Sequence, residues 1–177
     1  MTEIEFPRQY RLDEIGSAER AITISASADE CAALAQRFDL RAVTRLEAEA
    51  TLSREGAIVT ARGRLIADVV QSCIATGDPV PASLTEPFLI RFTPESMTGE
   101  AEEIELSNED CDSVFYAGGA IDMGEAVAES LALALDPFPR SPNADTALRA
   151  AGVIGEDEAG PFGALRELRD KLSGGKP

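Results

Sequence analysis

The sequence contains no His and no Trp, and only three Cys among its 177 residues. Without His, the chain cannot form Ser-His-Asp triads, Cys-His dyads or His-ligated metal sites. The one close glycine pair, Gly118-Gly119, lacks the spacing of a phosphate-binding loop. Composition leaves only carboxylate, thiol or Ser-Lys chemistry open, and no nucleophile motif supports it. We therefore predict a binding protein and not an enzyme, with no catalytic residue, metal or cofactor.

Long apolar runs and a secretory leader are also missing. Residues 1–7 have neither a cationic start nor an apolar stretch, and the best apolar run, 126–135, is interrupted by Glu129 and Ser130. Cys31, Cys73 and Cys111 are scattered and odd in number, so no disulfide framework is indicated. We expect a cytoplasmic protein that does not enter a membrane, with Cys31 packed as a small apolar residue.

Positive charge is scarce. The chain has 32 acidic and 16 basic residues and a formal charge of -16. Such a chain repels nucleic acid unless its cations gather on one surface, and it attracts basic partners. Charge alone therefore favours a basic protein partner over naked RNA.

The clearest structural signal is alternation between residues 45 and 71. Apolar residues recur at every second position on both sides of Glu55-Gly56, which we take as a two-residue hairpin turn. This turn predicts the cross-strand pairs Leu52–Val59, Ala50–Ala61, Ala48–Gly63, Leu46–Leu65, Glu49–Arg62 and Glu47–Arg64. One face of the hairpin is then apolar, and opposite charges meet across the other.

Arg62 and Arg64 allow two interpretations. They resemble an RNA-binding pair, since cations on an exposed sheet face can contact phosphates. Their predicted carboxylate partners instead indicate a neutralised, solvated face, which is the interpretation that the pairing favours.

The remaining pattern predicts an α+β fold. Strands are expected at 19–25 and 84–92, with Pro87 at a sheet edge or bulge, and 72–83 is expected to be a connection. Helices are expected at 27–38 and from Asp122 to 135, each with a Glu at capping-box distance. We predict a mainly antiparallel sheet, which could curl toward a barrel, packed with two helices and followed by a short C-terminal helix. The domain organisation is 1–140 as one domain, 141–160 as a linker and 161–177 as a tail.

An acidic segment interrupts the domain. Between Glu95 and Asp112 there are eight acidic residues and no Lys or Arg, with a short apolar stretch at 104–106 that predicts a strand. A solubilising loop and a docking site for a basic protein both fit, whereas the spacing of a calcium loop is absent.

The C-terminal tail has the opposite character. Four of the sixteen basic residues fall in the last seventeen, beside an apolar stripe of Phe162, Leu165, Leu168 and Leu172. A basic amphipathic helix after a linker either docks on its own acidic domain or is offered to a partner.

One ordered set of segments runs through most of the chain: the hairpin, the segments 67–73 and 121–135, Pro79, Phe88, Pro137 and Pro139, and the tail from Pro161 to Leu168. Together these segments resemble the DUF177 (YceD-like) family of bacterial large ribosomal RNA subunit accumulation proteins. The resemblance implies a factor for 23S rRNA accumulation and ribosome biogenesis, without enzymatic activity.

The sequence departs from the family at one point. Some members carry Cys-x-x-Cys where this chain has Cys73 and Thr76, with further Cys or His after the second helix, a set that could bind zinc. Here Thr76 replaces the second Cys, and residues 139–144 supply neither Cys nor His. A tetrahedral zinc site needs four ligands, so we predict no zinc and a packing role for Cys73.

Two binding functions follow. The first is an assembly factor that binds rRNA or a large-subunit precursor, and the second is a chaperone-like acidic module for a basic ribosomal protein. The oligomeric state is not indicated. The residues predicted to contact a partner are Arg41, Arg45, Arg62, Arg64, Glu100, Glu102, Glu103, Glu105, Phe162, Leu165, Arg166 and Arg169.

Overall fold

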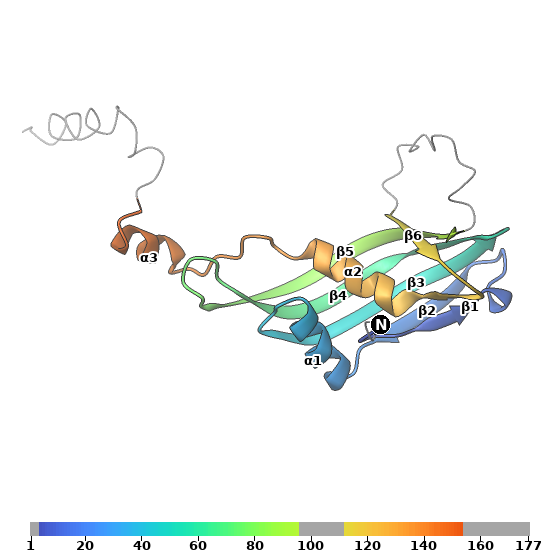
Figure 1. Ribbon diagram of the computed structural model, residues 1–177, viewed down its shortest axis with the longest axis horizontal. Helices are drawn as coiled ribbons and strands as arrows, with labels where there is room; N and C mark the ends of the chain where they lie inside the picture. The colour runs from blue at the N-terminus through green and yellow to red at the C-terminus, as the bar shows by residue number, and fades with distance from the viewer. Residues whose placement is uncertain (1–3, 96–111, 154–177) are drawn as a thin grey trace, which may run out of the picture. The chain divides into compact units, whose positions relative to one another are not determined.

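A computed structural model describes residues 4–95 and 112–153 of the chain (Figure 1). These residues divide into two compact units, one formed by 4–71, 79–95 and 112–137 and the other by 72–78 and 138–153. The elements in chain order are β1 (Gln9–Arg11), the 3-10 helix η1 (Leu12–Glu14), β2 (Arg20–Ser25), α1 (Ala28–Arg37), β3 (Ala42–Glu55), β4 (Ile58–Ser72), β5 (Pro79–Pro94), β6 (Asp112–Tyr116), β7 (Ala120–Asp122), α2 (Met123–Ala134) and α3 (Ala144–Ala150). None of the described helices is long and apolar enough to cross a bilayer.

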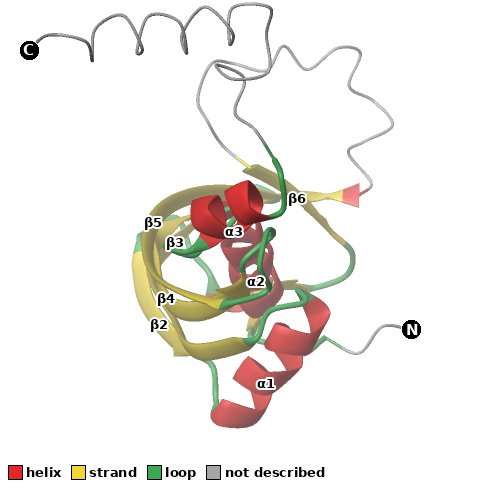
Figure 2. Ribbon diagram, turned by 90° about the vertical axis from the view of Figure 1, so that its left-hand side faces the viewer, coloured by secondary structure: helices red, strands yellow, loops and turns green. Residues whose placement is uncertain are grey.

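The first unit is built on a five-stranded sheet of order β2-β3-β4-β5-β6. The pairs β2–β3 and β3–β4 are antiparallel, and the six residues between β4 and β5 are too few for a crossover, so that pair is antiparallel as well. Only β6 runs parallel to its neighbour, with Ile90 opposite Asp112. The sheet curls around α2 and stays open, since β2 and β6 are not paired with each other in the described residues (Figure 2). The α+β prediction with a mainly antiparallel sheet is confirmed.

The β3–β4 hairpin has the predicted strands and faces, but the predicted register is wrong by two residues. The turn residues are Gly56 and Ala57, and Leu52 lies opposite Ala61, Ala50 opposite Gly63, and Ala48 opposite Leu65. Gly56 has a φ of 62°, and Ala57 does not have a positive φ, because Asp39 is the one described non-glycine residue that does. A positive φ at the first central residue alone suits a type II′ turn, which prefers Gly at that position. This preference places the turn at Gly56-Ala57, one residue later than the predicted Glu55-Gly56.

The predicted connection at 72–83 is shorter than expected. Strand β5 begins at Pro79, and Phe88, Ile90 and Phe92 follow on its buried face. It pairs with β6 only over Ile90–Pro94, so in the described residues the edge before Ile90 has no partner strand on that side. Proline lacks a backbone donor, which fits the position of Pro87 on this edge.

The core lies between the concave face of the sheet and the helices. Met123, Val127 and Leu131 of α2 are fully buried, and they repeat every four residues on one helix face. Cys31 and Leu34 of α1 belong to the same core cluster, as predicted, and burial raises the pKa of the Cys31 thiol.

The predicted start of α1 is confirmed, and that of α2 is confirmed except for the role of Glu125. Ser27 and Glu30 form the reciprocal capping box of α1. Asp122 caps α2 by accepting from the backbone N–H groups of Gly124 and Glu125. The side chain of Glu125 does not return to the cap, because it forms an ion pair with Arg37 instead.

The sequence did not indicate how the N-terminal segment packs. β1 pairs with β7 in a separate two-stranded sheet, and Phe6 is fully buried in the core. The segment crosses the first turn of α2 so closely that a Cβ at Gly124 would lie 1.8 Å from the carbonyl oxygen of Phe6. We call residues Phe6–Arg8 the N-terminal strap.

The described part of the second unit is small. The turn Ser72–Asp78 contacts the segment after Phe138, with the N–H of Ile74 donating to the carbonyl of Pro139. Helix α3 follows at Ala144–Ala150, inside the segment for which the sequence predicted linker character. Ala144 is buried beside Ser141, whose carbonyl accepts from its N–H group.

Candidate interaction surfaces

The predicted cationic residues of β3 and β4 lie on the outward face of the sheet. Arg64 donates to Glu49 over 2.8 Å, the residue directly opposite it, and Arg45 pairs with Glu47 on its own strand at 2.7 Å. Both pairs are largely exposed, so each contributes little to stability. The predicted partners Glu47 for Arg64 and Glu49 for Arg62 are wrong, because the register differs by two residues.

The charge of Arg62 is therefore not neutralised by a carboxylate on the facing strand, contrary to the favoured interpretation. Arg62 lies opposite Thr51, and no ion pair links it to a carboxylate in the described residues. Arg91 on the neighbouring strand β5 is also exposed, outward-facing and without an ion pair in that part of the chain. Phe115 of β6 adds an aromatic side chain, 55% exposed, on the same face. We call Arg62, Arg91 and Phe115 the outer patch.

Sequence reasoning found Arg62 but missed Arg91 and Phe115. The available signal was alternation around Phe88, Ile90 and Phe92, which puts Arg91 on the opposite face of its strand. For Phe115 there was no comparable signal, because the strand that carries it is only five residues long.

The other predicted contacts are divided between described and undescribed residues. Arg41 lies in the turn before β3, where its backbone N–H donates to Val70. The acidic predictions Glu100, Glu102, Glu103 and Glu105 and the tail predictions Phe162, Leu165, Arg166 and Arg169 lie outside the described residues.

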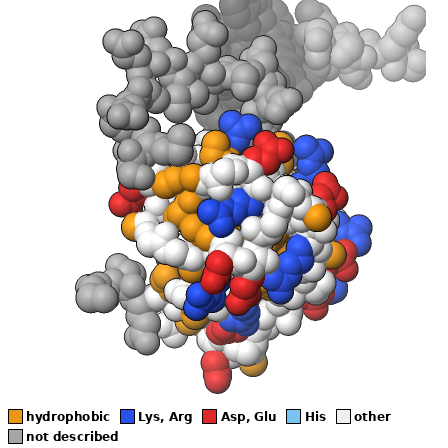
Figure 3. Space-filling view, turned by 90° about the vertical axis from the view of Figure 1, so that its right-hand side faces the viewer, with side chains coloured by type: hydrophobic (Ala, Val, Ile, Leu, Met, Phe, Trp, Pro, Cys, Tyr) orange, Lys and Arg blue, Asp and Glu red, His pale blue; other side chains and the backbone are white. Residues whose placement is uncertain are grey.

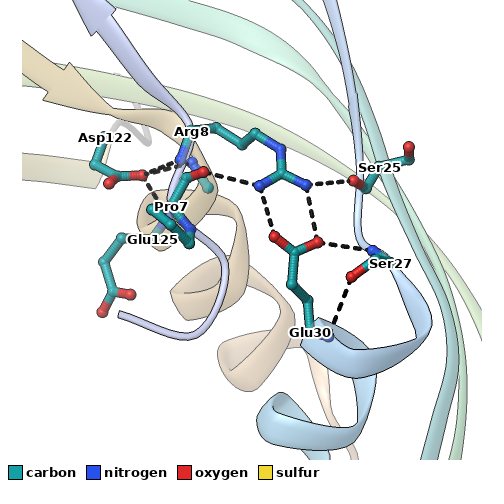
Figure 4. A network of polar contacts seen from close by, with 8 residues as sticks. Pro7, Arg8, Ser25, Ser27, Glu30, Asp122 and Glu125 are labelled. Atoms are coloured by element: carbon teal, nitrogen blue, oxygen red, sulfur yellow. Dashed lines mark hydrogen bonds and ion pairs between the residues drawn. The ribbon is translucent and has the colours of Figure 1, made fainter. Parts of the chain in front are cut away.

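Two further arginines hold the N-terminal segment and take no part in an open surface. Arg8 of the strap forms two hydrogen bonds with the Glu30 carboxylate, at 2.7 and 2.9 Å, and another with the Ser25 carbonyl (Figure 4). This pairing, with the backbone of Ser27, lowers the pKa of Glu30 to about 2. Arg37 of α1 bridges Glu5 and Glu125, and the Glu125 contact raises the pKa of its guanidinium.

Charges of both signs are mixed on the surface. Figure 3 shows one face on which Arg side chains lie beside Asp or Glu side chains and no extended cationic area is visible. Two more exposed pairs, Arg11 with Asp13 and Arg20 with Glu14, lie near the start of the chain. This mixing is unlike the concentrated basic surface of a protein that binds nucleic acid by charge alone.

The second unit contains a polar cluster around Cys73. Thr76 and Ser141 both donate to the Asp78 carboxylate, at 2.8 and 3.3 Å, and their hydroxyl oxygens are 3.2 Å apart. The thiol is buried, and hydrogen bonds from the Ser141 backbone and the Thr76 side chain lower the pKa of Cys73 to about 6. Cys73 is thus an acceptor within a hydrogen-bonded cluster as well as a packing residue.

These residues do not form the tetrahedral zinc site considered from the sequence. The positions that spacing brings together are Cys73, Thr76, Ser141 and Ala144, of which only the first is a zinc-binding residue type. The two hydroxyls are already hydrogen-bonded to Asp78. No group of three or more metal-ligating side chains occurs anywhere in residues 4–95 and 112–153. The arrangement stabilises the turn through hydrogen bonds.

A groove lies between helix α2 and the edge strand β6. Its volume is about 200 Å³, and it is lined by Ile90, Asp112, Ser113, Val114, Ala126, Glu129, Ser130 and Leu133. Leu133 is 78% exposed, the largest value among the exposed large apolar side chains of the described residues. None of the described residues that line the groove is Lys or Arg. The groove is thus apolar with an acidic rim, and sequence reasoning did not find it.

Comparison with known proteins identifies the family. The family model described as large ribosomal RNA subunit accumulation protein YceD matches residues 61–169, which is more than half of the chain. No curated protein and no solved structure matches the sequence. The match includes most of β4, all of β5, the outer patch, both sides of the groove and the Cys73 cluster. The chain therefore belongs to the YceD family of large ribosomal RNA subunit accumulation proteins.

Proposed function

We propose that this protein supports accumulation of 23S rRNA in the bacterial cytoplasm by binding rRNA or a precursor of the large ribosomal subunit. The observation that carries the proposal is the family match over residues 61–169. Binding protects an RNA by covering it or by holding it in a foldable conformation, and neither requires chemistry by the protein.

The side-chain chemistry supports binding and gives no support to catalysis. The described surfaces offer hydrogen-bonding, apolar and charged groups, but no nucleophile beside a general base. Cys73 is surrounded by hydroxyls and a carboxylate that already accepts their hydrogen bonds. A catalytic thiol has to be reachable by its substrate, whereas the Cys73 thiol is buried.

The outer patch is the surface best suited to RNA. An aromatic side chain and arginines on a sheet face can stack with unpaired bases and contact phosphates. Arg62 and Arg91 are the arginines of this face that no described carboxylate neutralises. With two such cations and a negative net charge, we expect modest affinity for RNA alone.

A second function is supported by the charge distribution. The chain carries twice as many acidic as basic residues, and most described arginines already have carboxylate partners. An acidic protein of this kind attracts a basic ribosomal protein and could deliver it to the precursor. In this alternative, protein contacts replace RNA contacts as the main source of affinity.

Sedimentation of lysates that contain the tagged protein tests the proposal. We expect it in fractions that hold large-subunit precursors and 23S rRNA, and absent from mature subunits. Replacing Arg62 and Arg91 together by Ala should reduce this co-sedimentation several-fold. The matched control replaces Arg11 and Arg20, two exposed arginines with carboxylate partners, and should leave it unchanged.

The same experiment separates the two functions. Crosslinking before nuclease digestion recovers rRNA fragments if the outer patch contacts RNA. Recovery of a basic ribosomal protein without RNA would instead favour the acidic module. A protein found only in the free fractions and crosslinked to neither RNA nor a basic ribosomal protein would contradict both.

A further inference from the structure

The groove between α2 and β6 combines two features used for peptide recognition. One is the sheet edge: β6 is the last strand in the sheet order, and no strand lies beyond it in the described residues. The other is the cavity beside it, whose floor is formed by Ile90, Val114 and Ala126. An extended peptide can add to an edge through backbone hydrogen bonds while alternate side chains enter a neighbouring pocket.

The backbone of β6 can supply this pairing. It pairs with β5 on one side, from Ile90–Asp112 to Pro94–Tyr116, and within residues 4–95 and 112–153 no second strand pairs with it. Successive residues of a strand direct their backbone N–H and C=O groups to opposite sides. The groups of β6 that do not point to β5 therefore point to the open edge. Residues 112–116 contain no Pro and no Lys, the residues that commonly prevent pairing at edges.

The chemistry of the rim indicates which peptide fits. Glu129 stands exposed on the α2 side, four residues before Leu133, so both belong to the helix face along the groove. Ser130 donates its hydroxyl hydrogen to the Ala126 carbonyl, which leaves an apolar contact surface next to it. The carboxylate of Glu129 favours an Arg or Lys of the peptide, and the apolar floor favours a Val or Leu. Both can face the groove if they are two residues apart, because such residues share one face of a strand.

We propose that this groove binds an extended, basic segment of a partner protein by strand addition to β6. Phosphates of RNA are repelled by the acidic rim. A second copy of this chain is disfavoured by the formal charge of -16 on each copy. The inference goes beyond the proposed function. Because peptide binding is tested with purified protein, peptide binding and the role in 23S rRNA accumulation can each fail independently.

The test uses a fluorescently labelled nine-residue peptide, Arg-Arg-Val-Val-Arg-Arg-Val-Val-Arg, in which each strand face carries Arg and Val two residues apart. It is titrated against the full chain at low salt. We expect saturable binding in the micromolar range. A peptide of the same sequence that is N-methylated at two consecutive central residues should bind at least tenfold more weakly, since strand pairing is blocked on both of its edges. Equal affinity of the two peptides would overturn strand addition.

Variants of the protein locate the site. Glu129→Lys should weaken binding about tenfold, and the milder Glu129→Gln should weaken it about threefold. The matched control is Glu86→Lys, an equal charge change at another exposed residue, which we expect to alter affinity by less than twofold. Similar losses for Glu86→Lys and Glu129→Lys would show that net charge alone binds the peptide and would overturn the proposal.

Leu133 gives a test that is independent of charge. Leu133→Ser removes an exposed apolar side chain, and it should weaken the peptide several-fold without changing the fold measured by circular dichroism. Sedimentation equilibrium of the protein without peptide tests whether a second copy of the chain occupies the groove. A dimer that Leu133→Ser dissociates would assign the groove to a second copy of the chain and contradict the proposal.

Discussion

The contact between the N-terminal strap and helix α2 makes Gly124→Ala an informative substitution. In an unobstructed helix, replacing Gly by Ala stabilises a protein by about 1 kcal/mol. Here the added Cβ would stand 1.8 Å from the Phe6 carbonyl oxygen and 3.0 Å from the Arg8 backbone nitrogen. Both contacts involve backbone, so the strap has to move. We therefore expect destabilisation in place of stabilisation.

The magnitude follows from what the strap loses when it moves. Phe6 is fully buried, and exposing such a side chain costs about 2–3 kcal/mol. Two backbone hydrogen bonds anchor Arg8, one to the Asp122 carboxylate and one from Met123, and each contributes about 1 kcal/mol. After subtracting the helix gain of about 1 kcal/mol, the expected loss is about 3 kcal/mol if the strap detaches.

Urea unfolding, followed by circular dichroism, measures this change. The matched control is Gly119→Ala, since no atom lies within 4 Å of a Cβ at that position, and we expect a change of less than about 0.5 kcal/mol. The loss in Gly124→Ala should shift the thermal midpoint downward by about 6–12 °C for a domain of this size. An unchanged or raised midpoint in Gly124→Ala would refute the close packing of the strap on α2.

Three further results are expected. The Arg8–Glu30 contact lowers the pKa of Glu30 to about 2, so the contact stabilises the fold fully above pH 4.5, and this stabilisation is lost as the pH falls toward 2. The free energy of unfolding of the wild type should therefore fall by about 1–2 kcal/mol more over this pH range than that of Glu30→Gln. The Cys73 thiol is buried and its pKa is lowered to about 6, so the ultraviolet absorbance of the thiolate should rise between about pH 5 and 7 in the wild-type chain and not in Cys73→Ser. A rise confined to the ordinary thiol range of about pH 8–9 would contradict the cluster. Gly63→Ala should destabilise the protein by about 1–3 kcal/mol in urea, because its Cβ would lie 2.2 Å from the Glu49 carbonyl oxygen, and a neutral effect would argue against the observed register.

Much of the first unit could be predicted because local patterns and tertiary packing agree there. Alternation over the β3–β4 hairpin predicted which residues face the core, and a shift of two residues preserves those faces. The shift did change the charge pairs, since Arg64 meets Glu49 and Arg62 meets Thr51. The determinant was the φ preference at a single turn residue, Gly56, which alternation does not specify.

Features made by distant segments could not be predicted. Strands β1 and β7 have three residues each, too few for a periodic signal, and they pair only because the strap is anchored on α2. Strand β6 joins the sheet in parallel directly after the acidic segment 95–112, and its five residues are too few for a clear alternation. The groove and the position of Phe115 depend on β6, so sequence patterns did not predict them, whereas they could place Arg62 and Arg91 on outward faces.

The central claim is tested most directly by the ratio of 23S to 16S rRNA in cells depleted of this protein. We predict a selective fall in 23S rRNA, restored by the wild-type chain and restored less by the chain in which Arg62 and Arg91 are replaced by Ala. An unchanged ratio, in cells where depletion of the protein is verified, would contradict a role in accumulation of the large-subunit RNA.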